Sequence, residues 1–236
     1  MSSVDDARPE PRRPAFVEVP KPGGGARRLT VLHSTDSTAY GRAVGRLAAM
    51  LERVLGPAVA ANRVEPGPIV RLRPWREERR RFEARRRALV GTAGLVVKTD
   101  VRDCYPSIEP SVVASSLLRL GAHPSEIGPV RQLLEELGEA GVRGLPIGPD
   151  PSAVLANAVL TAADDAVRSA DGRHLRWVDD VWAAARDDRH ADEILDRIRE
   201  ALSRIGLRLN EAKTRTLERG ESQALIHGLA GEDAYR

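Results

Sequence analysis

Three aspartates are the residues whose types and neighbours could do chemistry in this chain of 236 residues. Asp179 and Asp180 are adjacent, and the Trp-Val and Val-Trp pairs that flank them predict two buried strands joined by a tight turn. Two carboxylates in such a turn repel each other and are costly to desolvate unless a cation lies beside them. Asp100 ends an apolar run that predicts another buried strand.

If these strands are neighbours in one sheet, Asp100 lies beside the turn that carries Asp179 and Asp180. Carboxylate oxygens suit a hard divalent cation, and two such ions about 3.5–4 Å apart are the usual device for in-line phosphoryl transfer. One ion would lower the pKa of an attacking 3′-hydroxyl, and the other would neutralise a pyrophosphate leaving group. The pattern therefore indicates metal-dependent phosphoryl transfer.

A bare pair of aspartates means little in this chain, because three further pairs occur, at 5–6, 164–165 and 187–188. We interpret these three as solvated surface or helix-end charges. The pair at 179–180 differs from them in its apolar and aromatic setting.

Composition excludes several classes of protein. Hydrophobic residues make up 42% and charged residues 30%, as in a soluble globular protein with a sizeable core. No apolar run approaches the roughly 20 residues that span a bilayer, and the first residues have no signal-peptide pattern, so we expect a cytoplasmic protein without a membrane partner. The single Cys104 excludes a disulfide framework and a multi-cysteine zinc site. Only three of the 37 basic residues are Lys, so each Lys is worth inspecting.

The elements that must position the aspartates follow from the hydrophobic pattern. Alternation around a Gly-rich loop predicts a β-hairpin over 16–32, after a Pro- and Arg-rich arm at 1–14 that we expect to be disordered. Apolar residues three and four apart predict helices, and short apolar runs predict strands. The helices are expected at 38–55, 111–120, 125–138, 152–168 and across 194–205, and the strands at 94–100, in a pair across 174–185, and at 207–209; the tail from 222 to 230 could form one more. This order predicts an α+β fold, with an antiparallel sheet and helices on one face.

Five segments of the chain resemble, in the right order, the motifs of reverse transcriptases. The segment from Lys98 to Ile108 resembles motif A, with its leading acid and an aromatic residue five positions later. Residues 144–157 resemble motif B, 177–180 the hairpin turn of motif C, and 206–214 motif D. Residues 19–28 resemble the fingers hairpin of bacterial members, such as the group II intron, retron and phage-defence types.

This resemblance implies a right-hand polymerase that depends on Mg²⁺ or Mn²⁺. We expect a fingers-like basic subdomain at 15–93 and a palm at 94–236, built on a ferredoxin-like antiparallel sheet. Because the chain ends soon after motif D, the thumb is expected to be absent or vestigial. A partner protein, a structured RNA or a homo-oligomer would then replace it as the clamp on the duplex.

The resemblance also assigns roles to residues of motifs A and C. Asp100 and Asp179 match the acids that bind the metal most directly, and Asp180 ranks third. The backbone from Val101 to Cys104 matches the segment that cradles the incoming triphosphate. Tyr105 matches the aromatic residue that blocks a 2′-hydroxyl and so favours deoxynucleotides; a core aromatic at a helix start is the alternative.

Four cations receive roles in the same way. Lys21 and Arg28, or Arg27, match the fingers residues that grip the β- and γ-phosphates, unless the hairpin is merely solvated. Lys213 matches the motif D lysine that could protonate the pyrophosphate, or it is a surface cation. The stretch at 71–87, with nine Arg against three Glu, is either a surface for template phosphates or a solvated helix face.

The motif B loop carries the last assigned residues. Gly144, Pro146 and Gly148 would let the chain approach template and nucleotide closely, although an ordinary helix-entry loop is the alternative. Two positions depart from the usual pattern. Trp177 stands where the family commonly has Tyr or Phe, and Ile147 stands where retroviral members have Gln.

The sequence thus predicts an RNA-directed DNA polymerase that extends a primer on an RNA template with deoxynucleotides, in a bacterial defence system or a retroelement. Two alternatives remain open. One is a non-catalytic or partner-dependent RNA-binding scaffold with a polymerase fold, and the other is a template-independent nucleotidyltransferase.

Overall fold

The computed structural model describes residues 13–21, 24–65 and 67–228, so all but the last two positions of the predicted arm lie outside the described residues. The strands are β1 (Ala15–Pro20), β2 (Ala26–Val31), β3 (Leu95–Asp100), β4 (Arg173–Trp177), β5 (Asp180–Ala185) and β6 (Arg215–Glu218). The helices are α1 (Ser34–Val54), α2 (Trp75–Thr92), α3 (Cys104–Ser107), α4 (Pro110–Arg119), α5 (Pro124–Glu139), α6 (Asp150–Ser169), α7 (Asp188–Ser203), the 3₁₀ turn η1 (Glu211–Lys213) and α8 (Arg219–Ile226). None of the described helices is both long and apolar enough to cross a membrane.

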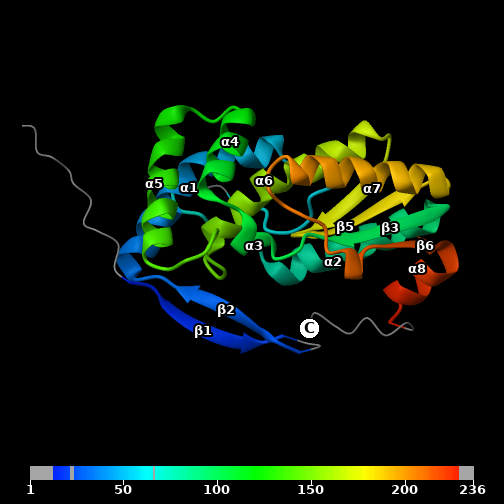
Figure 1. Ribbon diagram of the computed structural model, residues 1–236, viewed down its shortest axis with the longest axis horizontal. Coiled ribbons are helices and arrows are strands. Elements are labelled where there is room, and N and C mark those ends of the chain that lie inside the picture. Colours follow the sequence, from blue (N-terminus) through cyan, green and yellow to red (C-terminus); the bar gives the residue numbers. More distant parts are fainter. Residues whose placement is uncertain (1–12, 22–23, 66, 229–236) are drawn as a thin grey trace, which may run out of the picture.

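Four strands form one antiparallel sheet in the order β4-β5-β3-β6, while β1 and β2 form a separate hairpin (Figure 1). The register of the central strands β3 and β5 places Asp100 directly opposite Asp180. A tight turn of two residues joins β4 to β5. The structure therefore confirms the strand that ends at Asp100 and the strand pair across 174–185.

Helices cover both faces of this sheet. α6 and α7 pack on one face, as expected, and α2 lies on the other, in contact with β4 and β5 and beside α8 (Figure 1). Phe82, Leu89 and Val90 of α2 are buried against a cluster that includes Val96 and Trp182 of the sheet. Because strand side chains alternate between faces, these two sheet residues need an apolar cover of their own. The apolar residues of α2 provide this cover along one side of a helix that is otherwise rich in arginine.

Helix α1 joins the N-terminal part of the chain to the rest of the core. It packs on α5 and α6, and its residues Val44, Leu47 and Leu51 belong to one buried cluster with them. The Tyr40 hydroxyl lies 3.0 Å from the Ser152 hydroxyl in a buried hydrogen bond between α1 and α6. The hairpin that precedes α1 is therefore attached to a shared core.

Two expected strands near the C-terminus are wrong. Residues 207–209 make only a single bridge, between Leu209 and Val101. The strand that pairs with β3 at this edge of the sheet is β6. Residues 222–226, expected to begin a strand, belong to helix α8 instead. Residues 229–230 of the same expected strand lie outside the described part. A capping box starts this helix, since Glu218 and Glu221 each accept from the other's backbone N–H.

Replacing Phe82 with Ala tests the position of α2. Because this side chain is fully buried between α2 and the sheet, we expect Phe82→Ala to lower the free energy of unfolding by about 3–5 kcal/mol. Urea denaturation followed by circular dichroism measures the change. Arg87→Ala, on the exposed side of the same helix, is the control and should change stability by less than about 0.5 kcal/mol. Equal, small effects of both substitutions would show that α2 is not packed on the sheet.

Candidate active site

The ends of β3, β4 and β5 bring the three aspartates together. Asp100 and Asp180 are cross-strand partners, and Asp179 occupies the turn before β5. The Val101 amide donates to the Asp179 carbonyl oxygen at 3.3 Å, which ties the turn to the end of β3. Val178, the other turn residue, has a φ of +56°, an unfavourable conformation for a β-branched side chain.

The pKa of Asp179 shows the electrostatic effect of this arrangement. Burial, together with the negative charges of Asp100 and Asp180, raises the pKa of its carboxyl group to about 7, while the charge of Lys213 acts in the opposite direction. A carboxylate in this setting is stabilised by any cation that comes close to it.

Asp180 has a different set of neighbours. Burial raises the pKa of its carboxyl group, and Lys98 opposes this shift. The Trp182 indole N–H donates to Asp180 Oδ2 at 2.9 Å, from the same face of β5. The Asp180 carboxylate is thus engaged on the side of the sheet that α2 covers.

Asp100 is held by two residues of the predicted motif D. Asn210 Nδ2 lies 3.2 Å from Oδ1 of Asp100, and the Asn210 amide donates to the Asp100 carbonyl oxygen at 2.7 Å. Lys213 Nζ lies 3.3 Å from Oδ2 of Asp100. The predicted general acid Lys213 therefore reaches the site, although 113 positions separate it from Asp100 in the chain.

The donor set fits a divalent cation of the Mg²⁺ type. Among the described residues, no three His, Cys, Asp or Glu side chains are grouped closely enough to hold a metal by themselves. Mg²⁺ is commonly bound by one or two carboxylates, with waters and substrate phosphates as the other ligands. Asp100 and Asp179 supply such a pair, and their mutual repulsion is what a cation would relieve.

The motif B loop is packed tightly against two residues of motif A, Tyr105 and Pro106. Gly144 has a φ of +61°, and a Cβ there would lie 2.6 Å from the carbonyl oxygens of Tyr105 and Pro106. The Leu145 amide donates to the Tyr105 carbonyl at 2.9 Å. Burial raises the pKa of the Tyr105 phenol, which therefore stays neutral at physiological pH. Close approach within the protein therefore requires glycine at 144, while its approach to template and nucleotide stays a prediction.

The fingers hairpin contacts the other end of this loop. The Thr30 amide of β2 donates to the Ile147 carbonyl at 2.7 Å, and Gly148 follows with a φ of +123°. Pro146 is buried between these contacts.

Among the predicted cations of the hairpin, Arg27 lies near Tyr105. Its positive charge slightly lowers the pKa of the Tyr105 phenol, whereas burial raises that pKa. The Arg28 guanidinium stacks on the Phe16 ring, 3.6 Å from its centroid. The Lys21 amide donates to the Gly25 carbonyl in the hairpin turn, whose residues 22 and 23 lie outside the described part.

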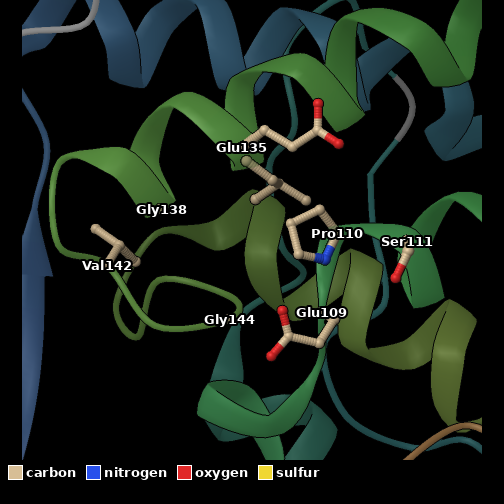
Figure 2. A pocket seen from close by; sticks show the side chains of 8 residues that line it. Glu109, Pro110, Ser111, Glu135, Gly138, Val142 and Gly144 are labelled. Carbon is tan, nitrogen blue, oxygen red and sulfur yellow. The ribbon is translucent and has the colours of Figure 1, made fainter.

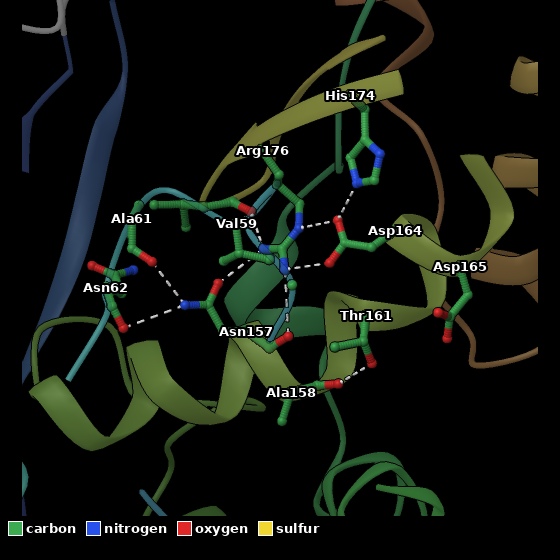
Figure 3. A network of polar contacts seen from close by, with 12 residues as sticks. Val59, Ala61, Asn62, Asn157, Ala158, Thr161, Asp164, Asp165, His174 and Arg176 are labelled. Atoms are coloured by element: carbon green, nitrogen blue, oxygen red, sulfur yellow. Dashed lines mark hydrogen bonds and ion pairs between the residues drawn. The ribbon is translucent and has the colours of Figure 1, made fainter. Parts of the chain in front are cut away.

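A buried polar network behind the turn corrects our interpretation of the pair at 164–165. Asp164 is only 2% exposed and binds Arg176, which is fully buried (Figure 3). Although burial alone would raise it, Arg176 and His174 hold the pKa of Asp164 well below its usual range. Only Asp165 is a surface charge, paired with Arg119.

The sequence held one signal of this network that we did not use. Asn157 and Asp164 are seven residues apart in an otherwise small and apolar helix, and that spacing puts both on one face.

The cavity in Figure 2 lies on the other side of the motif B loop. It encloses about 310 Å³ and is lined by residues of α4 and α5 and by Gly144, with Glu109 and Glu135 at its edge. None of the three aspartates lines it. We therefore place the chemistry at the strand ends and not in this cavity.

Comparison with known proteins identifies the family of the chain. A family model described as reverse transcriptase (RNA-dependent DNA polymerase) matches residues 19–227. The chain belongs to the reverse transcriptase family. This family consists of nucleotidyltransferases, and the match spans both the hairpin and the sheet. No curated protein matches the sequence.

Two solved structures share the fold of this reverse transcriptase chain. Telomerase from Candida albicans, in complex with a fragment of telomeric RNA, has a TM-score of 0.52 and 13% identity, covering 86% of this chain and 41% of that one. Apo telomerase from Candida tropicalis has a TM-score of 0.58 and 14% identity, covering 92% and 46%. The chain thus spans less than half the length of either. The α+β fold of palm and fingers is confirmed.

The raised pKa of Asp179 predicts a pH-dependent stability. Without metal, the folded protein keeps a proton on Asp179 up to about pH 7, whereas the unfolded chain releases it near pH 4, so the free energy of unfolding falls as pH rises through this window. We expect Asp179→Asn to be more stable than wild type by up to about 4 kcal/mol at pH 8 and no more stable at pH 4. Urea titrations in EDTA measure this, and a difference independent of pH would contradict it. Added Mg²⁺ should reduce the advantage at pH 8.

Proposed function

We propose that this reverse transcriptase is an RNA-directed DNA polymerase that adds deoxynucleotides to a primer 3′ end. The observation that carries the proposal is the meeting of Asp100 and Asp179 at the ends of paired strands, with Lys213 beside them. Family membership alone would leave the state of the active site open. The repulsion between partly buried carboxylates is a feature that a scaffold without metal has no physical reason to keep.

Each residue of the site has its own role in the proposed reaction. Asp100 and Asp179 would hold Mg²⁺ or Mn²⁺, which when bound would supply Lewis-acid activation of the primer hydroxyl and neutralise phosphate charge. The Lys213 ammonium, already 3.3 Å from Asp100, donates a proton to the leaving pyrophosphate. Arg27 and Lys21 bring positive charge to the triphosphate from the hairpin. Tyr105 excludes a 2′-hydroxyl on steric grounds.

RNA template, primer and deoxynucleotides are the proposed ligands. The form of the hairpin and of motif B supports a bacterial type, in a defence system or a retroelement. A cytoplasmic location suits a chain with one, buried, cysteine.

One observation favours the alternative of a non-catalytic RNA-binding scaffold. Each of two acids already has a partner within the protein, since Asp100 is bound by Asn210 and Lys213, and Asp180 by Trp182. A scaffold would keep these contacts when RNA and nucleotide bind, whereas an enzyme must release Lys213 from Asp100.

Primer extension on RNA with deoxynucleotides and Mg²⁺ or Mn²⁺ separates these proposals. We expect extension by wild type, and a fall in kcat of about 10²–10³-fold for Asp100→Asn and Asp179→Asn, because each removes a carboxylate that would hold the cation that stabilises the transition state. Asp171→Asn is the matched control, since Asp171 is exposed at a φ of +57° that Asn adopts well, and it should keep full activity. RNA binding without extension by any of the four proteins would favour the scaffold. Extension that needs no template would favour the nucleotidyltransferase.

The sugar discrimination of Tyr105 gives a separate prediction. Tyr105→Ala should lower the preference for deoxynucleotides over ribonucleotides by about 10-fold or more, because it opens the space for a 2′-hydroxyl. Single-nucleotide incorporation kinetics with the two triphosphates measure this ratio. Tyr105→Phe keeps the ring and should keep the selectivity. Unchanged selectivity in Tyr105→Ala would make Tyr105 a core aromatic only.

A further inference from the structure

Arg176 is the most deeply buried charged side chain among the described residues, with no exposed surface. Its guanidinium forms a two-pronged ion pair with Asp164 of α6, with Nε 2.9 Å from Oδ1 and Nη2 2.8 Å from Oδ2 (Figure 3). His174 Nε2 lies 3.0 Å from the same Oδ1. The ion pair fixes the plane and position of the guanidinium.

The remaining nitrogen of that guanidinium reaches the turn of the active site. Nη1 donates to the Val178 carbonyl oxygen at 2.8 Å and to Asn157 Oδ1 at 2.9 Å. Val178 is the residue with φ of +56°, and the next residue is Asp179. A non-glycine residue keeps such a conformation only where the surroundings impose it. The charged hydrogen bond from Arg176 is a contact of this kind.

The backbone of the same strand is fastened to a third segment. The Arg176 amide donates to the Ala58 carbonyl and its carbonyl accepts from the Ala60 amide, both at 2.9 Å. Asn157 Nδ2 donates to the Ala61 carbonyl at 2.8 Å. The turn is therefore held from α6, from β4 and from the loop at 58–61.

We propose that Arg176, oriented by Asp164 and Asn157, is the positioning residue that holds the Val178–Asp179 turn so that Asp179 faces Asp100. Buried ion pairs often add little to stability compared with apolar residues, so stability alone does not account for this one. Lysine cannot replace Arg176, because one ammonium group cannot bind both oxygens of Asp164 and still reach the Val178 carbonyl. The effect on catalysis rests on the proposed function, whereas the effect on cation binding does not.

Arg176→Lys tests this role through two measurements. The first is binding of Tb³⁺, a probe for a hard-cation site, followed by its luminescence on excitation of Trp177 and Trp182 beside the aspartates. We expect an affinity about 10-fold lower, because residues that orient metal ligands have effects of this size. The second is primer extension, where kcat should fall about 10²-fold while KM for the deoxynucleotide stays within about 2-fold.

Two control variants separate positioning from general destabilisation. Arg173→Lys is the same substitution on the same strand, at an exposed residue that donates to Thr92, and it should change neither measurement. Leu133→Val removes a buried methylene from α5, which packs on α1 and α4. Assayed at a temperature equally far below its own Tm, it should keep wild-type Tb³⁺ affinity and kcat.

The outcomes are distinct. Wild-type Tb³⁺ affinity in Arg176→Lys, or an equal loss in Leu133→Val, overturns the positioning role. If wild type extends no primer but Tb³⁺ affinity falls in Arg176→Lys alone, the proposed polymerase function fails and the positioning role stands. Should Arg176→Lys not fold, Asn157→Ala removes the second acceptor of Nη1 and the contacts to the Ala61 and Asn62 carbonyls, and leaves the ion pair of Arg176 with Asp164 in place. Asn157→Ala should lower Tb³⁺ affinity by less than the 10-fold or so expected for Arg176→Lys. An unchanged Tb³⁺ affinity in Asn157→Ala overturns the proposal.

Discussion

The repulsion between carboxylates at the ends of β3 and β5 is the interaction on which the rest of this structure depends. Antiparallel pairing in a fixed register puts Asp100 opposite Asp180, and the turn adds Asp179 beside them. Burial and like charge together raise the pKa of Asp179 to about 7. Such a cluster is costly unless a cation accompanies it, and in the protein alone Lys213 supplies that charge in part.

The segments around the aspartates are held to one another by hydrogen bonds between distant parts of the chain. The fingers hairpin is bonded to the motif B loop at Ile147, that loop to Tyr105, and the turn of the active site to Arg176. A shift in any one of them is therefore transmitted to the site. This rigidity suits phosphoryl transfer, in which positioning and charge stabilisation account for most of the catalysis.

Much of this could be predicted from the sequence, because the chemistry is encoded locally. The setting of Asp179 and Asp180 between apolar residues predicted the turn and its two strands, and the run before Asp100 predicted the third. Features that depend on tertiary contacts could not be predicted in this way. Asp164 was interpreted as a surface charge because its partner Arg176 lies twelve residues away on another element. The stripe of α2 that packs on the sheet was hidden among nine arginines.

Anomalous diffraction from crystals soaked in Mn²⁺ and a deoxynucleotide tests the central claim most directly. The account predicts an anomalous peak within bonding distance of both Asp100 and Asp179, with the Lys213 ammonium moved away from Asp100. The opposite result would be a crystal with bound deoxynucleotide that shows no peak between these carboxylates and in which Lys213 still pairs with Asp100. That result would contradict the account.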